Sequence, residues 1–122
     1  MHPLMLCIHI SKERALRLSF AAMSLGVRVK IVAPDQEDQT LAALCGLEQP
    51  AAKAPKAQVD GEMLVFAFME DQLLERLLPA LRSDMAPVRL KAVLTPDNRG
   101  WTCGQLYREL KGEAEAFEKN NR

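Results

Sequence analysis

The sequence lacks several features that would assign it to a functional class directly. Its 16 basic and 16 acidic side chains cancel, so there is no positive excess for binding phosphate groups, and nucleic acid is not expected as a partner. The longest uninterrupted apolar run, 63–69, is far shorter than the roughly 20 residues of a membrane-spanning helix. The first ten residues have neither the basic segment nor the cleavage site of a secretory signal. We therefore expect no contact with membranes either.

Motifs that commonly bind nucleotides or carry catalysis are also missing. No G-x-G-x-x-G follows an expected strand, and neither G-x-x-x-x-G-K-[ST] nor G-x-S-x-G occurs. Two histidines are few for a metal centre or a Ser-His-Asp triad. We therefore expect no cofactor and no metal site, and the absence of a catalytic constellation favours a role other than that of an enzyme.

The three cysteines Cys7, Cys45 and Cys103 are odd in number and widely spaced, without a C-x-x-C pair. This pattern indicates reduced thiols in the cytoplasm rather than a disulfide framework or a zinc site. Cys103 falls where a helix is expected to begin, and backbone N–H groups there can stabilise a thiolate. It is a candidate nucleophile, but burial as an ordinary core residue is the more economical interpretation.

Two segments of the chain resemble each other, VRVKIVAPDQ at 27–36 and VRLKAVLTPDN at 88–98. We interpret them as parts of a duplication in a single domain of 122 residues. Its repeats cover about 3–47 and 62–118, and the proline-containing segment 48–61 is expected to be an exposed connector.

Each repeat is expected to have the order βαβα. The strands are predicted at 4–10, 27–33, 63–69 and 88–94, and the helices at 12–25, 37–45, 70–83 and 103–117, with a kink at Pro79. The first and third strands are almost wholly apolar and suit the interior of a sheet, whereas the second and fourth carry Arg and Lys and suit its edges. With right-handed crossovers, this predicts an α/β fold whose four-stranded sheet has the order 2-1-3-4 and packs against four helices.

The sequence leaves the direction of the two central strands open. If they are parallel, the fold is flavodoxin-like, and a crevice between their ends would bring together His9, Ser11, Lys12, Glu70 and Asp71 as a binding surface. If the halves are related by a two-fold axis, the strands are antiparallel and the helices lie mainly on one face. The same residues then have structural interpretations, with Ser11 as a helix cap and the two acids at the positive end of a helix.

The stretch LKAVLTPDNRGWTCGQL, at 90–106, predicts a strand, a turn and the start of the last helix. Thr102 and Gln105 have the spacing of a capping box, and Trp101 and Leu106 that of a hydrophobic staple. The tryptophan is therefore explained first as part of a helix start.

The same stretch resembles the bacterial domain-of-unknown-function family 3783. The residues that carry the resemblance are Leu90-Lys91-Ala92-Val93, Thr95, Asn98, Trp101-Thr102 and Leu106, with Gln39-Thr40-Leu41 and Gly46 in the first half. The resemblance implies no activity, cofactor or catalytic residue. It does add Lys91, Thr95, Asn98 and Trp101 to the candidate binding surface.

The sequence as a whole favours a non-catalytic module that binds a small ligand or another protein, or that has a regulatory role. The alternative is a small enzyme that uses Cys103 or the pair Glu70 and Asp71. A homodimer formed through an edge strand is a third hypothesis, against which the Arg and Lys residues of those strands argue.

Overall fold

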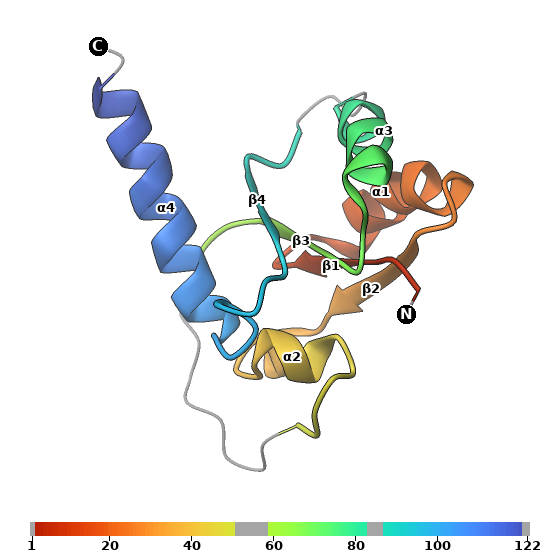
Figure 1. The fold of residues 1–122 in the computed structure, drawn as a ribbon. Helices are drawn as coiled ribbons and strands as arrows, with labels where there is room; N and C mark the ends of the chain where they lie inside the picture. The colour runs from red at the N-terminus through yellow and green to blue at the C-terminus, as the bar shows by residue number, and fades with distance from the viewer. Residues whose placement is uncertain (1, 51–58, 83–86, 121–122) are drawn as a thin grey trace.

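The computed structural model describes residues 2–50, 59–82 and 87–120. It is a three-layer α/β structure in which a four-stranded sheet lies between two pairs of helices (Figure 1). The strands are β1 (Leu4–Ile8), β2 (Arg28–Val32), β3 (Met63–Ala67) and β4 (Leu90–Val93). The helices are α1 (Lys12–Ser24), α2 (Leu41–Leu44), α3 (Asp71–Leu81) and α4 (Cys103–Asn120), and a short 3-10 helix, η1 (Pro34–Gln36), follows β2.

The strands have the order β2-β1-β3-β4, which confirms the predicted order and fold class. β2 pairs parallel with β1, and β4 pairs parallel with β3. β1 and β3 are antiparallel, with Leu4 opposite Ala67 and Ile8 opposite Met63. The flavodoxin-like alternative is therefore wrong, and an approximate two-fold axis normal to the sheet relates the two βαβ units.

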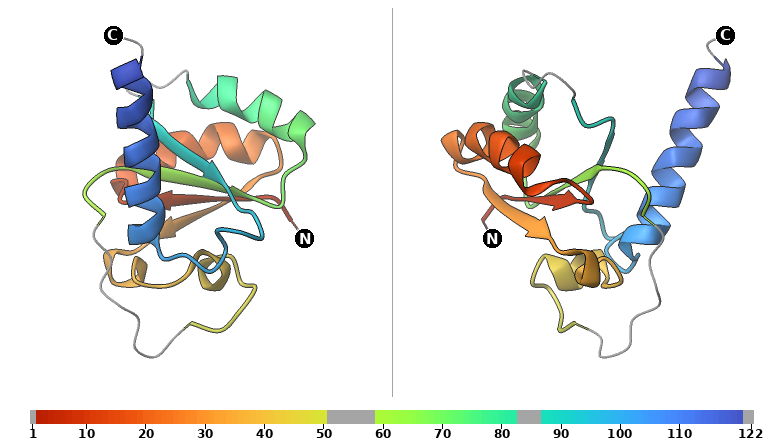
Figure 2. Two further views of the ribbon diagram at one scale, coloured as in Figure 1. Left: turned by 60° about the vertical axis from the view of Figure 1, so that its left-hand side comes forward. Right: turned by 180° about the vertical axis from the view of Figure 1, so that it is seen from behind.

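Both faces of the sheet are covered, as the views in Figure 2 show. One core cluster lies between the sheet and the helices α1 and α3, and a second lies between the sheet and α2 and α4. Alternate residues of the central strands supply the two clusters, Met5, Cys7, Leu64 and Phe66 on the first face and Leu6, Ile8, Met63 and Val65 on the second. The expectation that an antiparallel arrangement would put the helices mainly on one face is wrong, because the helix after each edge strand packs on the opposite face.

Glycine ends both helices of the first half. Gly26, with φ 78°, and Gly46, with φ 81°, have the left-handed backbone that glycine adopts without strain. The next N–H in each case, from Val27 or Leu47, donates to a carbonyl five residues earlier, at 3.0 and 2.8 Å. These are Schellman motifs, and Val27 is buried as the motif favours.

Other boundaries differ from the prediction. α2 begins at Leu41 and not at residue 37, because the Thr40 hydroxyl accepts a hydrogen bond from the Ala43 N–H at 3.1 Å and so caps the helix. α3 contains Pro79 and ends two residues later at Leu81. The segments 51–58, in the predicted connector, and 83–86, where α3 was expected to end, lie outside the described residues. None of the described helices is long and apolar enough to cross a membrane.

Candidate functional site

The structure does not form the crevice that parallel central strands would have made. Because β1 and β3 are antiparallel, Ser11 and Lys12 lie beyond one end of the sheet, and Glu70 and Asp71 lie beyond the other. Ser11 caps α1, with its hydroxyl 3.3 Å from the Arg14 N–H, and Glu70 occupies the same capping position before α3. The crevice prediction is therefore wrong, and these residues have the roles of helix starts.

His9 lies at the end of β1 and contacts a buried carboxylate. Its Nδ1 atom is 3.2 Å from Oε1 of Glu37, which is only 9% exposed. His9 has a left-handed backbone with φ 58°, and Phe68, at the equivalent position after β3, has φ 61°. Since both halves use this conformation between strand and helix, it belongs to the turn and not to a histidine-dependent reaction. No group of three or more potential metal ligands occurs in the part of the chain that the structure describes.

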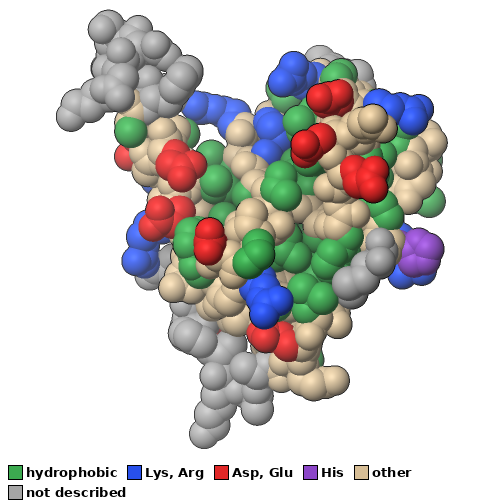
Figure 3. All heavy atoms as spheres, in the orientation of Figure 1, with side chains coloured by type: hydrophobic (Ala, Val, Ile, Leu, Met, Phe, Trp, Pro, Cys, Tyr) green, Lys and Arg blue, Asp and Glu red, His purple; other side chains and the backbone are tan. Residues whose placement is uncertain are grey.

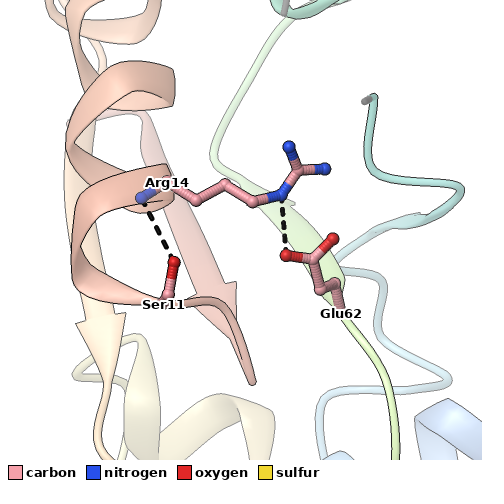
Figure 4. A network of polar contacts seen from close by, with 3 residues as sticks. All are labelled: Ser11, Arg14 and Glu62. Carbon is pink, nitrogen blue, oxygen red and sulfur yellow. Dashed lines mark hydrogen bonds and ion pairs between the residues drawn. The ribbon is translucent and has the colours of Figure 1, made fainter. Parts of the chain in front are cut away.

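An ion pair joins α1 to the residue before β3 (Figure 4). Nε of Arg14 lies 2.7 Å from Oε2 of Glu62. The pair borders an open hollow of about 440 Å³ beside α4, where Arg89, Tyr107 and Lys111 also lie. The face in Figure 3 likewise has acidic and basic side chains interspersed, with neither sign dominant. The hollow itself is lined by three basic residues and by the two acidic residues Glu62 and Glu115, so it carries charges of both signs.

The turn after β4 explains two residues of the family pattern. Oδ1 of Asn98 accepts from the Thr95 N–H at 2.8 Å, and Oγ1 of Thr95 accepts from the Asn98 N–H at 3.2 Å. Nδ2 of Asn98 also donates to the Val93 carbonyl at 3.0 Å. Asn98 is 8% exposed, so its amide group replaces water in closing this turn. Its role is structural.

Lys91 and Trp101 also have partners within the fold. Nζ of Lys91 donates to the Val88 carbonyl at 2.7 Å. Partial burial, and to a lesser degree the nearby charge of Arg82, lower the pKa of Lys91. The Trp101 carbonyl accepts from the Leu41 N–H at 2.9 Å, which ties the start of α4 to the start of α2. The Lys91 side chain thus has a partner within the fold, and the backbone of Trp101 joins the two helix starts.

The helix start predicted at Thr102 is confirmed. Gln105 N–H donates to the Thr102 hydroxyl at 3.3 Å, and Thr102 N–H donates to Oε1 of Gln105 at 3.0 Å, which is a capping box. Thr102 also forms an antiparallel bridge with Thr40, the cap of α2. Trp101 and Leu106 belong to the same core cluster, as the staple requires. The two caps thus meet near the two-fold axis of the fold.

Cys103 lacks the environment of a reactive thiol. Its side chain is fully buried, and burial, reinforced by the charges of Glu37 and Asp38, raises its pKa to about 12. Burial likewise raises the pKa of Cys7 to about 12 and that of Cys45 to about 11. A thiolate at Cys103 would therefore be a minor species at neutral pH, which removes the main support for the enzyme alternative.

Alkylation at pH 9 tests this interpretation of the cysteines. An ordinary thiol is mostly ionised there, so the urea-unfolded chain should react with iodoacetamide at all three cysteines within minutes. The folded protein should react far more slowly at Cys7 and Cys103, because both are buried and protonated. Site-resolved mass spectrometry measures both rates. Rapid and selective labelling of Cys103 in the folded protein would restore the enzyme alternative.

The most unusual surface is one that sequence reasoning missed. Leu16, Phe20 and Met23 on α1 are 58%, 68% and 65% exposed, and Ile31 on the neighbouring β2 is 43% exposed. We call these four residues the α1–β2 apolar surface. It borders a shallow hollow of about 680 Å³ between α1 and β2. The right-hand view of Figure 2 shows α1 on the side of the molecule away from α4.

The α1 helix has two apolar stripes, and only one of them is buried. The buried stripe of the helix contains Ala15, Leu18 and Ala22, which face the sheet. Leu16, Phe20 and Met23, which are four and three residues apart, lie on a second face. A helix with two apolar stripes has one more than packing against a single sheet requires, so the second stripe is available for another contact.

Comparisons with known proteins add a family to this description. Neither curated protein sequences nor solved structures gave a significant match. A family model described as a domain of unknown function, DUF3783, matches residues 62–117, from just before β3 into α4. This region contains the L-K-A-V strand and the W-T pair on which the resemblance was based, so the resemblance is confirmed. The second half of the chain is therefore similar to the DUF3783 domain, whose function is unknown.

Proposed function

We propose that the protein is a non-catalytic protein-interaction module that binds an extended apolar strand along the outer edge of β2. The observation that carries this proposal is the α1–β2 apolar surface, where three large side chains of one helix are more than half exposed. Contiguous apolar surface of this kind is a common mark of protein–protein contact.

The backbone of β2 supports a strand as the binding partner. β2 is an edge strand, and no described strand pairs with its outer side. The Arg28 N–H donates inward to the Pro3 carbonyl at 2.9 Å. Because the direction of backbone groups alternates along a strand, the N–H and C=O groups of Val29 and Ile31 point outward. These four groups are available to a strand added at this edge.

The side chains around the hollow favour an apolar peptide over a polar small molecule. Val29 and Ile31 lie opposite Met5 and Cys7 in the parallel register, so their side chains are on the α1 face of the sheet. The hydroxyl of Ser19, which also lines the hollow, already donates to the Leu16 carbonyl at 2.6 Å. Apart from Ser19 and Arg28 the residues that line the hollow are apolar or glycine, so backbone pairing with apolar contacts would supply the affinity.

A synthetic octapeptide that alternates isoleucine with threonine and lysine tests the proposal. We expect the amide NMR signals of Val29 and Ile31 to shift saturably when the peptide is titrated at low protein concentration. Ile31→Lys should weaken binding by about tenfold or more, because it places a charge in the apolar hollow.

Val93→Lys is the matched control for this experiment. Val93 is 42% exposed and has the corresponding position on the other edge strand, opposite Phe66 as Ile31 is opposite Cys7. The Val93→Lys variant should bind the peptide with the same affinity as the unchanged protein. The absence of binding, or shifts centred on β4, would contradict the proposed site.

A further inference from the structure

The fold already contains one example of how two βαβ units associate. β1 and β3 pair antiparallel about the internal two-fold axis, and α1 and α3 pack against each other on the same face of the sheet. The two helices lie over strand pairs that are separated by two strand spacings, about 10 Å. This matches the distance of about 8–10 Å at which helix axes pack. Strand pairing and helix packing are thus satisfied by one symmetry operation.

The outer edge of the first unit has the same two elements without a partner. β2 offers the backbone groups of Val29 and Ile31, and α1 presents its second apolar stripe beside that edge. A two-fold axis normal to the sheet and next to β2 would pair β2 with another β2. It would also bring α1 beside a second α1 at the same spacing of about 10 Å.

We propose that the partner of the α1–β2 apolar surface is a second copy of this chain, giving a two-fold dimer with a continuous eight-stranded sheet. The dimer rests on the interaction surface of the proposed function and identifies its partner. In it, Leu16, Phe20 and Met23 of each α1 pack against those of the other, beneath paired β2 strands. A two-fold interface uses the same patch on both subunits, and this patch contains both a strand edge and a helix face that can pair with themselves.

The second half of the chain shows what the corresponding edge looks like when it is protected. In an alignment of α1 with α3, the buried residues Leu18 and Ala22 correspond to the buried residues Leu77 and Leu81. The positions that correspond to the apolar stripe of α1 are occupied by different residues in the second half. Leu16, Phe20 and Met23 correspond to Glu75, Pro79 and Arg82.

The edge strands differ in the same way. Val29 of β2 lies opposite Met5, and the equivalent place opposite Leu64 in β4 is held by Lys91. A lysine that points inward at an edge strand is a typical device against strand pairing. The charged side chains therefore discourage association at β4, whereas the first half lacks them on the same face.

The composition of the surface favours a second copy over a different partner. Its four side chains are apolar, with Arg28 at the border of the hollow, so it fits a partner whose contact face is itself apolar, as that of a second copy is. Lys30 alternates with Val29 and Ile31 and so faces the other side of the sheet, where its Nζ donates to the Leu44 carbonyl at 3.1 Å. The Lys30 side chain therefore lies away from the α1 face, whereas Arg28 borders the hollow at the start of β2.

Sedimentation equilibrium over a range of concentrations tests the dimer. We expect the unchanged protein to be dimeric at high concentration, and Phe20→Glu to raise the dimer dissociation constant by about 30-fold or more, as central apolar residues do in interfaces. Ile31→Lys should act in the same direction, and Val93→Lys should leave the constant unchanged. Circular dichroism checks that each variant is folded. A protein that is monomeric throughout, or a dimer that these α1–β2 variants leave intact, would overturn the proposal.

Amide hydrogen exchange distinguishes this geometry from other dimers. In the proposed dimer the amides of Val29 and Ile31 exchange more slowly as the concentration rises, whereas those of Arg28 and Lys30 point inward and change less. If the exchange rates of all four amides depended equally on protein concentration, strand pairing at this edge would be contradicted. If the protein is monomeric but binds the octapeptide at Val29 and Ile31, the dimer is wrong and the proposed function stands. If neither association occurs, both are wrong.

Discussion

Phe66→Ala is expected to lower the free energy of unfolding by about 3–5 kcal/mol, the largest loss for any single change considered. Phe66 lies on the central strand β3 and is 2% exposed. Its ring belongs to the core cluster between the sheet and the helices α1 and α3. Truncation removes apolar area from the core and leaves a cavity that strands on both sides keep from collapsing. Domains of this kind are stable by only about 5–15 kcal/mol, so the variant would be close to unfolding.

Urea denaturation followed by circular dichroism measures this loss. Phe66→Leu is the graded control, because leucine keeps most of the apolar volume and should cost clearly less. The comparison is made at a fixed protein concentration, since association would add to the apparent stability of every variant. A loss below about 1 kcal/mol for Phe66→Ala would mean that the cluster around β3 is less tightly packed than described.

The sheet was predictable because its signals are local. Strands with two buried faces need apolar residues throughout, and the runs at β1 and β3 have them, whereas β2 and β4 contain Arg and Lys. Short connections with right-handed crossovers then fixed the order of the strands. That the two halves derive from a duplication remains a prediction, although their elements follow the same order.

The direction of the central strands was not predictable from the same signals. A strand buried on both faces has the same composition whether its neighbour is parallel or antiparallel. The predicted crevice required parallel central strands. Because these strands are antiparallel, Ser11 and Glu70 lie at opposite ends of the sheet. An inference about a site that depends on strand direction therefore needed information that residue patterns do not contain.

The α1–β2 apolar surface was missed for a different reason. A helix is identified by its apolar periodicity, and the residues of α1 that establish this periodicity, Leu18 and Ala22 among them, are buried. Phe20 and Met23 strengthened the helix prediction without showing which face they occupy. Their exposure became evident only when the position of the sheet fixed the inner face of the helix.

Asn98→Ala is expected to lower the free energy of unfolding by about 2–4 kcal/mol, because it leaves buried polar groups without partners. The side chain accepts from the Thr95 N–H and donates to the Val93 carbonyl, at 2.8 and 3.0 Å. An alanine methyl group replaces neither contact, and little water can reach a position that is 8% exposed. Thermal and urea unfolding of the two proteins would measure the difference.

Two further variants separate this structural role from a role in binding. Asn98→Asp keeps an oxygen that can accept from Thr95 but replaces the donor to Val93 with a carboxylate oxygen that repels this carbonyl, so it should not restore the lost stability at neutral pH. Gln36→Ala changes the corresponding Pro-Asp turn of the first half, where the exposed Gln36 accepts from the Ala33 N–H at 3.3 Å. Its cost should stay below about 0.5 kcal/mol, because water can replace an exposed hydrogen bond. If Asn98→Ala were as mild as Gln36→Ala, turn closure would not explain why Asn98 belongs to the family pattern, and a ligand contact would become the better explanation.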